Sequence, residues 1–263
     1  MMHFTKMHGL GNDYLYVYGE PVNPEKLSIR LSERHFGAGS DGMIWISHSD
    51  IADFKMRIFN ADGSEAKMCG NGIRCVGKYV YDKGYTDKKH LTIETLSGIK
   101  TLDLKTMGGK VKSVAVDMGK AVISDDITIN VDGKDIIITP VSMGNPHAVI
   151  FVSDAENVQL DKIGPAIEHH EAFLGGVNVE FVQLIDESTI RMRVWERGSG
   201  ITMACGTGAC ASAAASVIKD HCRHNEEISV ILDGGTLKIN VSADYGITMT
   251  GPAETIYEGE VEI

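Results

Sequence analysis

Two cysteines, Cys69 and Cys205, each stand directly before a Gly-x-Gly turn, in the segments KMCGNGIRC and MACGTGAC. A cysteine in such a place can be a metal ligand, half of a disulfide, a buried core residue, or a nucleophile or base at the start of a helix. The residues around each cysteine, and the elements that carry them, decide between these roles.

The two segments belong to a longer internal repeat. KMRIFNADGSEAKMCGNG (55–72) aligns without a gap on RMRVWERGSGITMACGTG (191–208). Three further pairs of similar segments occur in the same order in both halves: GLGND (9–13) with SMGNPH (142–147), HFGAGSD (35–41) with FLGGVNV (173–179), and TLSGIK (95–100) with DGGTLK (233–238). The period is too long for a solenoid, so we infer a duplication that produced two similar domains.

Each half of the chain combines short strands with few helices. Many segments, such as MIWIS and TIRMRVWE, are short, rich in β-branched and aromatic residues, and bounded by Gly, Asp, Asn or Pro, which is typical of strands. Helices are expected at 71–84 and 207–220, just after each Cys-Gly pair, with one outer helix per half at 24–35 and 161–173. The Ala-rich segment 207–220 should be buried on all sides.

The expected fold class is α/β (α+β). We predict two pseudo-symmetric domains, each a mixed, mostly antiparallel sheet wrapped around a central helix. Residues 1–118 form the N-terminal domain and 119–250 the C-terminal domain in this interpretation. The tail 251–263 has no counterpart at the end of the first half, and we expect it to return to the first domain as a strand.

If each central helix begins beside its glycine, Cys69 and Cys205 lie at helix N-termini, where unpaired N–H groups and the helix dipole favour an anion. In general, the pKa of such a thiol is lowered from about 8.5 to roughly 3.5–7.5. The same N–H groups can hold a carboxylate. One such site per half suggests a substrate whose α-carbon lies between two thiols. That arrangement suits a racemase or epimerase, which removes a proton from one face of a carbon and returns one to the other.

Other roles for the cysteines fit less well. Zinc binding by Cys69, Cys75, Cys205 and Cys210 would need a C-x5-C spacing wider than usual, and it would place ligands inside helices. A disulfide between Cys69 and Cys205 would more readily inactivate the protein than serve it, and no C-x-x-C is present. Cys75, Cys210 and Cys222 are interpreted as small buried hydrophobes.

Composition limits the partners. The chain has 36 acidic against 25 basic residues, a formal net charge of −11, which argues against a nucleic-acid-binding surface. No apolar run reaches the length of a membrane span, and the start MMHFTKMHGLGND lacks the features of a secretory signal. We therefore expect a cytoplasmic protein with a small-molecule substrate, no nucleic-acid or membrane partner, and no metal.

Six motifs resemble the diaminopimelate epimerase family along nearly the whole chain: KMHGLGNDYLYV, RHFGAGSDG, FNADGSEAKMCGNGIRC, VSMGNPHAV, NVEFVQ and RVWERGSGITMACGTGAC. The resemblance implies interconversion of LL- and meso-2,6-diaminopimelate in lysine and peptidoglycan precursor biosynthesis, without pyridoxal phosphate, metal or any other cofactor. It also implies a homodimer.

The same resemblance assigns roles to individual residues. Cys69 and Cys205 become the acid/base pair, and backbone N–H groups at the two helix starts hold the reacting carboxylate, at Gly70, Asn71, Gly206 and Thr207. The remaining substrate-binding positions are Asn12, Asn60, Asn145, Asn178, Glu196 and Arg197. Arg197 suits a carboxylate, Glu196 an ammonium group, and an asparagine side chain both donates and accepts. Some of these asparagines could instead be turn formers, and Glu196 with Arg197 a solvated ion pair.

Two rival functions remain open. A racemase or epimerase of another amino acid, similar to proline racemase, could use the same cysteine pair, although Arg197 and the asparagines favour a substrate with a polar distal end. A protein of the phenazine-biosynthesis type would share the architecture but lack the two thiols, and both Cys69 and Cys205 are present.

Overall fold

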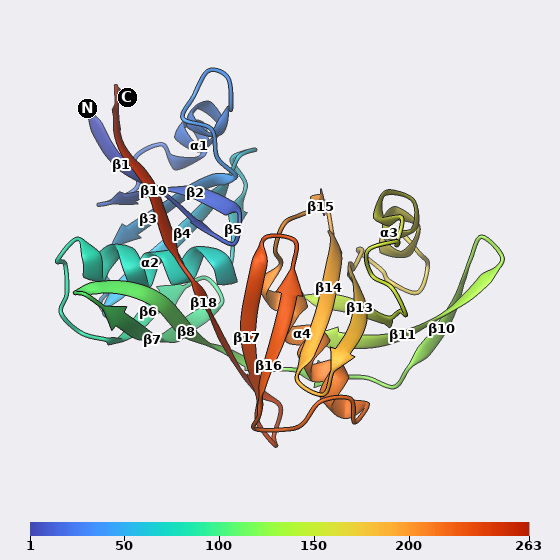
Figure 1. Ribbon diagram of the computed structural model, residues 1–263. Helices are drawn as coiled ribbons and strands as arrows, with labels where there is room; N and C mark the ends of the chain where they lie inside the picture. Colours follow the sequence, from blue (N-terminus) through green and yellow to red (C-terminus); the bar gives the residue numbers. More distant parts are fainter. Residues whose placement is uncertain (263) are drawn as a thin grey trace. The chain divides into compact units, whose positions relative to one another are not determined.

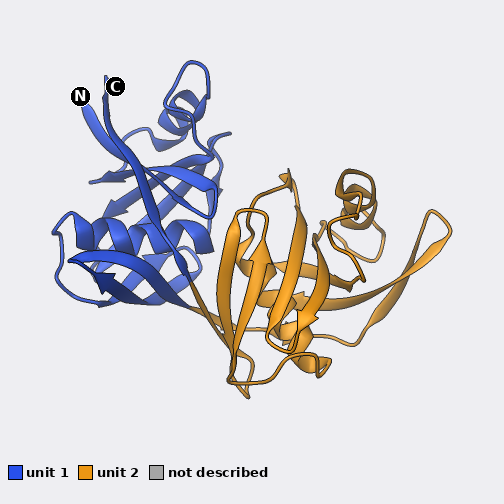
Figure 2. Ribbon diagram, viewed as in Figure 1, with its two compact units in different colours: residues 1–116, 251–263 blue, residues 117–250 orange. Residues whose placement is uncertain are grey.

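The computed structural model describes residues 1–262, and the chain divides into two compact units (Figure 2). Unit 1 comprises Met1–Val116 and Gly251–Ile263, and unit 2 comprises Asp117–Thr250. Strands dominate both units, and within residues 1–262 there are four helices (Figure 1). The predicted mixed α/β class is confirmed.

Unit 1 is a continuous series of paired strands around a helix. In order of pairing the strands are β19 (Glu254–Val261), β1 (Met2–Gly9), β2 (Asn12–Tyr18), β3 (Gly42–Ser47), β4 (Phe54–Asn60), β6 (His90–Thr95), β7 (Gly98–Met107) and β8 (Lys110–Lys120). The short β5 (Glu65–Ala66) adds to β4. Only β2 with β3 and β4 with β6 run parallel in this series, and these pairs are connected through α1 (Pro24–Ser32) and α2 (Gly70–Asp82).

Unit 2 repeats this topology. The pairing order is β10 (Ile127–Val131), β11 (Lys134–Ser142), β12 (Pro146–Phe151), β13 (Asn178–Asp186), β14 (Thr189–Glu196), β16 (Glu227–Leu232), β17 (Gly235–Val241) and β18 (Gly246–Pro252). The short β9 (Val122–Ile123) and β15 (Gly200–Ile201) add to β11 and β14. The parallel pairs β12/β13 and β14/β16 are connected through α3 (Leu160–Glu168) and α4 (Gly206–Ile218).

The pairing of strands has the same register in the two units, residue by residue. Met43 pairs with Phe59 in unit 1, and Val179 pairs with Trp195 in unit 2. Phe59 and Trp195 are equivalent in the repeat 55–72 and 191–208, and Met43 and Val179 are related by the same offset, so the two units can be compared residue by residue.

The central helices α2 and α4 begin one residue earlier than expected, because the preceding cysteine is the N-cap. Helix α2 buries Ile73, Val76 and Val80 completely, and α4 buries its alanines, as the Ala-rich sequence predicts. The outer helices are shorter than predicted. Helix α1 ends at Ser32 because Glu33 adopts an extended backbone with ψ 123°, and α3 ends at Glu168.

The last strand lies beside the first. In Figure 1, β19 runs along β1 in unit 1, and residues from Met2 to His8 pair antiparallel with residues from Val261 to Glu254. The fully buried Arg74 of α2 also donates to the Pro252 carbonyl oxygen at 3.1 Å. The chain therefore passes into unit 2 through β8 and returns through β18.

Candidate active site

Cys69 and Cys205 each cap the helix that follows them. Cys69 has an extended backbone (φ −138°, ψ 114°), and its Sγ accepts a hydrogen bond from the backbone N–H of Gly72 at 3.3 Å. Cys205 (φ −111°, ψ 112°) accepts from Gly208 at the same distance. Sulfur thus takes the place of the usual side-chain oxygen at the N-cap. The predicted location of both thiols at helix N-termini is confirmed.

The second glycine of each Cys-Gly-x-Gly segment leaves room for the neighbouring strand. A Cβ on Gly72 would lie 2.6 Å from Ile44 Cδ1, and a Cβ on Gly208 would lie 2.7 Å from Glu180 Oε1. Both distances are shorter than van der Waals contact allows, so the strand packs against the first helical turn only where no side chain intervenes.

In unit 1, Cys69 contacts one of the predicted asparagines. Its Sγ donates to Asn12 Oδ1 at 3.3 Å, and Asn12 Nδ2 donates to Asp41 Oδ2 at 2.9 Å. Asp41 therefore fixes which end of the Asn12 amide faces the sulfur. Burial is the main reason why the pKa of Asp41 is raised above its ordinary value.

The other two unit 1 asparagines have local roles. Asn71 is buried, and its Oδ1 accepts from Arg74 Nη2 at 3.0 Å, so the side chain is held inside the unit. Asn60 ends β4, and its Nδ2 donates to Ser64 Oγ at 3.1 Å across a turn.

In unit 2, a chain of polar contacts leads to Cys205. Asn145 Nδ2 donates to Thr207 Oγ1 at 3.3 Å, and this hydroxyl lies 3.6 Å from Cys205 Sγ. On its other side, Asn145 Oδ1 contacts His147 Nε2 at 3.1 Å. Three predicted residues of the C-terminal half are therefore brought together at the start of α4.

The remaining unit 2 residues lie at the ends of β13 and β14. Asn178 Oδ1 accepts from the Arg197 backbone N–H at 3.0 Å, and Asn178 Nδ2 donates to the Pro146 carbonyl oxygen at 3.0 Å. Arg197 Nη1 donates to the Gly175 carbonyl oxygen at 3.2 Å. Glu196 accepts from Thr202 Oγ1 at 2.5 Å, and its negative charge helps to raise the pKa of the Cys205 thiol. Glu196 is thus a neighbour of the Cys205 thiol, whereas the Arg197 guanidinium contacts the Gly175 carbonyl oxygen.

The prediction that the helix start lowers the pKa of the Cys205 thiol is wrong. Burial, followed by the negative charges of Glu196 and Glu180, raises the pKa of Cys205 well above its ordinary value, and the hydrogen bonds from Thr207 and Gly208 only partly oppose this. Burial also raises the pKa of Glu196. A helix N-terminus favours a thiolate, but here the desolvation of the sulfur and two carboxylates outweigh it.

Three residues near the thiols were not predicted as part of the site: Asp41, Glu180 and Thr202. Glu180 is the clearest omission, because its carboxylate is fully buried and lies 2.7 Å from His147 Nδ1. A charged residue in the apolar run NVEFV was a signal for it, since a carboxylate in the middle of a buried strand needs a partner.

The other three cysteines are buried, as predicted: Cys75 and Cys210 completely, and Cys222 with 4% exposed. Burial raises the pKa of Cys75 to about 11, which keeps it protonated. All five cysteines are thiols, and in residues 1–262 there is no cluster of three or more His, Cys, Asp or Glu side chains that could hold a metal ion. Nor does any helix among these residues have the length and apolarity needed to cross a membrane.

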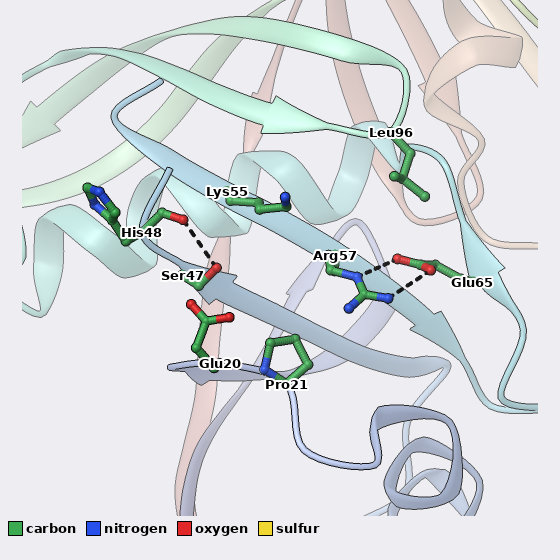
Figure 3. Close-up of a pocket in the computed structure, with 8 residues that line it drawn as sticks. All are labelled: Glu20, Pro21, Ser47, His48, Lys55, Arg57, Glu65 and Leu96. Carbon is green, nitrogen blue, oxygen red and sulfur yellow. Dashed lines mark hydrogen bonds and ion pairs between the residues drawn. The ribbon is translucent and has the colours of Figure 1, made fainter. Parts of the chain in front are cut away.

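A surface cavity of about 330 Å³ in unit 1 is not lined by any predicted site residue. Figure 3 shows its charged side chains, among which Arg57 pairs with Glu65 through two hydrogen bonds of 2.7 and 3.0 Å. Lys55 lies 3.0 Å from Glu94. Arg57 and Lys55 are thus already paired with carboxylates, and the cavity gives no sign of the chemistry at the cysteines.

Comparison with known proteins links the site to a family. The sequence model of the family described as diaminopimelate epimerase matches residues 4–124 and 139–256. The chain is 52% identical to a diaminopimelate epimerase of Methanococcus maripaludis over the whole of both chains. It is 54% identical to that of Bacteroides thetaiotaomicron, covering 98% of this chain and 97% of that protein.

Solved structures agree on the fold. A probable proline racemase from Agrobacterium radiobacter has a TM-score of 0.74 at 18% identity, covering 100% of this chain and 93% of that one. A phenazine biosynthesis protein of the PhzF family from Bacillus anthracis has a TM-score of 0.77 at 18% identity, covering 100% and 99%. At such identities the likeness shows the fold alone. The extended matches in sequence go further, and they show that this chain belongs to the diaminopimelate epimerase family.

Proposed function

We propose that this chain is an isomerase that interconverts LL- and meso-2,6-diaminopimelate, with Cys69 and Cys205 as the two acid/base groups. The observation that carries the proposal is the duplicated helix start, in which each sulfur caps a helix beside N–H groups suited to a carboxylate. Relatives at 52% and 54% identity that are named diaminopimelate epimerase support the choice of substrate.

The reaction needs one proton in and one proton out. One sulfur, as thiolate, takes the α-proton, and the other, as thiol, delivers a proton to the opposite face of the carbon, so the stereocentre inverts and the total number of protons is unchanged. Between these events negative charge develops on the α-carboxylate. The backbone N–H groups of Gly70, Asn71, Gly206 and Thr207 would stabilise that charge.

The remaining residues recognise the two amino-acid ends of the substrate. The Arg197 guanidinium pairs with a carboxylate. Glu196 accepts from an ammonium group, and Asn12, Asn60, Asn145 and Asn178 supply further donors and acceptors. The predicted domains, 1–118 with 251–263 and 119–250, each contribute one thiol and part of this set.

Hydrogen exchange tests the proposal directly. Reduced protein is incubated with LL-2,6-diaminopimelate in deuterium oxide, and the α-proton NMR signal is followed. We expect the signal to decay as meso-2,6-diaminopimelate appears. A protein that leaves this signal intact but exchanges the α-proton of proline would instead be a racemase of the alternative kind.

We also propose that the protein acts in the cytoplasm as a homodimer without a cofactor, as the family resemblance implies. Light scattering on the purified protein tests the dimer, for which a mass of twice 28.5 kDa is expected. Activity that survives dialysis against a metal chelator, with no absorbance from pyridoxal phosphate, is the expected result for a cofactor-free enzyme.

A further inference from the structure

Glu180 in unit 2 is fully buried, and in the described part of the chain only one of its two carboxylate oxygens has a hydrogen-bond partner. Its Oε1 lies 2.7 Å from His147 Nδ1, and neither side chain has any exposed surface. Within residues 1–262, Glu180 Oε2 has no hydrogen-bond partner. A buried carboxylate oxygen without a partner costs folding free energy, so a reason other than stability should account for it.

Unit 1 shows that the fold does not need a carboxylate here. Ile44 pairs with Ile58 on β3 and β4, and Glu180 pairs with Val194 on β13 and β14 at the equivalent positions. Ile44 also meets the helix-start Gly72 as Glu180 meets Gly208. The same backbone is therefore built once with an apolar residue and once with a charged one.

The carboxylate is close to the reactive sulfur. A Cβ placed on Gly208 would be 2.7 Å from Glu180 Oε1 and 3.2 Å from Cys205 Sγ, so both side chains border the space that this one methyl group would fill. The second carboxylate beside Cys205 is Glu196, and the repeat aligns this residue with the neutral Asn60. Both positions carry a carboxyl group in unit 2 and a residue without one in unit 1.

Negative charge in a buried site favours the protonated form of a neighbouring acid. The titratable groups that face Cys205 are Glu180 from β13 and Glu196 from β14, and His147 from β12 lies behind Glu180. Through its contact with Glu180 Oε1, His147 also fixes the position of the carboxylate. Cys69 differs, since Asn12 contacts it with an amide oxygen.

We propose that Glu180 is a positioning residue for Cys205: held by His147, its buried carboxylate keeps the Cys205 sulfur protonated in the substrate-free protein. The inference rests on the proposed function, in which Cys205 is one of the two acid/base groups. It makes the helix starts of α2 and α4 chemically unequal before substrate binds.

Alkylation of the thiols tests the proposal without turnover. The full-length protein is treated with iodoacetamide over a range of pH, and the modification of Cys69 and Cys205 is followed separately by peptide mass spectrometry. In Glu180→Gln, which keeps the shape of the side chain, we expect Cys205 at neutral pH to react about tenfold faster, the effect of one pKa unit on the thiolate fraction. Cys69 in the same molecules should react at the wild-type rate.

Glu187→Gln is the matched control, because it removes one negative charge from an exposed side chain of the same β13–β14 hairpin. Both cysteines should keep their wild-type pH profiles in this variant. The proposal is overturned if Glu180→Gln leaves the Cys205 profile unchanged or moves both cysteines together. If that variant does not fold, Glu180→Ile carries the residue found at this position in unit 1, and the same outcomes apply. A failure of diaminopimelate exchange would count against the proposed function alone, since alkylation requires no substrate.

Discussion

The sulfur of Cys205 lies 3.3 Å from the backbone nitrogen of Gly208, the same distance that separates Cys69 Sγ from the nitrogen of Gly72. As helix caps the two thiols are therefore alike, and each has an N–H donor ready for the moment when it carries a negative charge. Their side-chain neighbours differ, with an amide beside Cys69 and carboxylates beside Cys205.

Serine at either thiol position should stop epimerisation, because a hydroxyl is a far weaker acid than a thiol. We expect kcat for Cys69→Ser and for Cys205→Ser to fall by about 10²–10⁴, the usual share of acid/base catalysis. The reaction is measured in both directions by following the circular dichroism signal of LL-2,6-diaminopimelate as it is consumed or formed. Cys222→Ala is the control, since that cysteine is buried away from the helix starts, and it should keep wild-type kcat. A serine variant with full turnover both ways would refute the two-base scheme.

Alanine at Gly208 should destabilise the protein more than alanine at Gly72. The new Cβ at residue 208 meets the Glu180 carboxylate, whereas at residue 72 it meets Ile44 Cδ1, the end of a side chain that can rotate. We expect Gly208→Ala to lower the free energy of unfolding by about 1–3 kcal/mol, as overpacking does, and urea titration measures it. Adding Glu180→Ala removes the obstacle and should recover part of the loss. Equal effects at residues 72 and 208 would contradict the packing argument.

Cys75 should make the protein lose stability at alkaline pH. Its pKa is raised from 9.0 to about 11 in the folded protein because it is buried, so the folded state holds this proton more tightly than the unfolded state. The contribution is complete below the unfolded pKa and is lost as pH rises through the folded pKa. Two pKa units amount to about 2.7 kcal/mol.

The measurement compares wild type with Cys75→Ala by urea unfolding from about pH 8 to about pH 11.5, the window set by those pKa values. The stability advantage of the wild type should shrink across this window by up to the stated amount. A constant difference between the two proteins at all pH values would show that Cys75 does not titrate as described.

Arg74 should be important for the stability of unit 1. Its guanidinium donates to the carbonyl oxygens of Gly70 and Pro252 and to Asn71 Oδ1, at 3.0 to 3.1 Å, and the residue is fully buried. Arg74→Met keeps much of the volume but leaves these acceptors without their donor. We expect a loss of about 2–5 kcal/mol in the free energy of unfolding.

Arg223→Met serves as the control for Arg74→Met, because Arg223 has a side chain that is 67% exposed and makes ion pairs only at the surface. Its effect should stay within about 0.5 kcal/mol. If the two methionine variants were equally stable, the contact of the Arg74 guanidinium with Pro252 at the end of β18 would not contribute to stability.

The sequence contained enough information for the duplication, the central helices and the caps, because glycine spacing and apolar periodicity are local signals. The same holds for strands such as β7 and β8, where lysines alternate with apolar residues as in a half-exposed strand. The inward rotation of the Asn71 side chain depends on Arg74, a contact made by packing around the helix. The protonation of Cys205 could not be predicted, because it depends on carboxylates that two other strands bring to the helix start.

The pairing of β1 with β19 places the beginning and the end of the chain side by side. During synthesis, β1 therefore leaves the ribosome about 250 residues before β19, and every strand of unit 2 is made in between. An unpaired β1 edge is a site for pairing with other chains. Unit 1 is begun before unit 2 and completed after it, so the β1 edge is exposed to other nascent chains until β19 has been made.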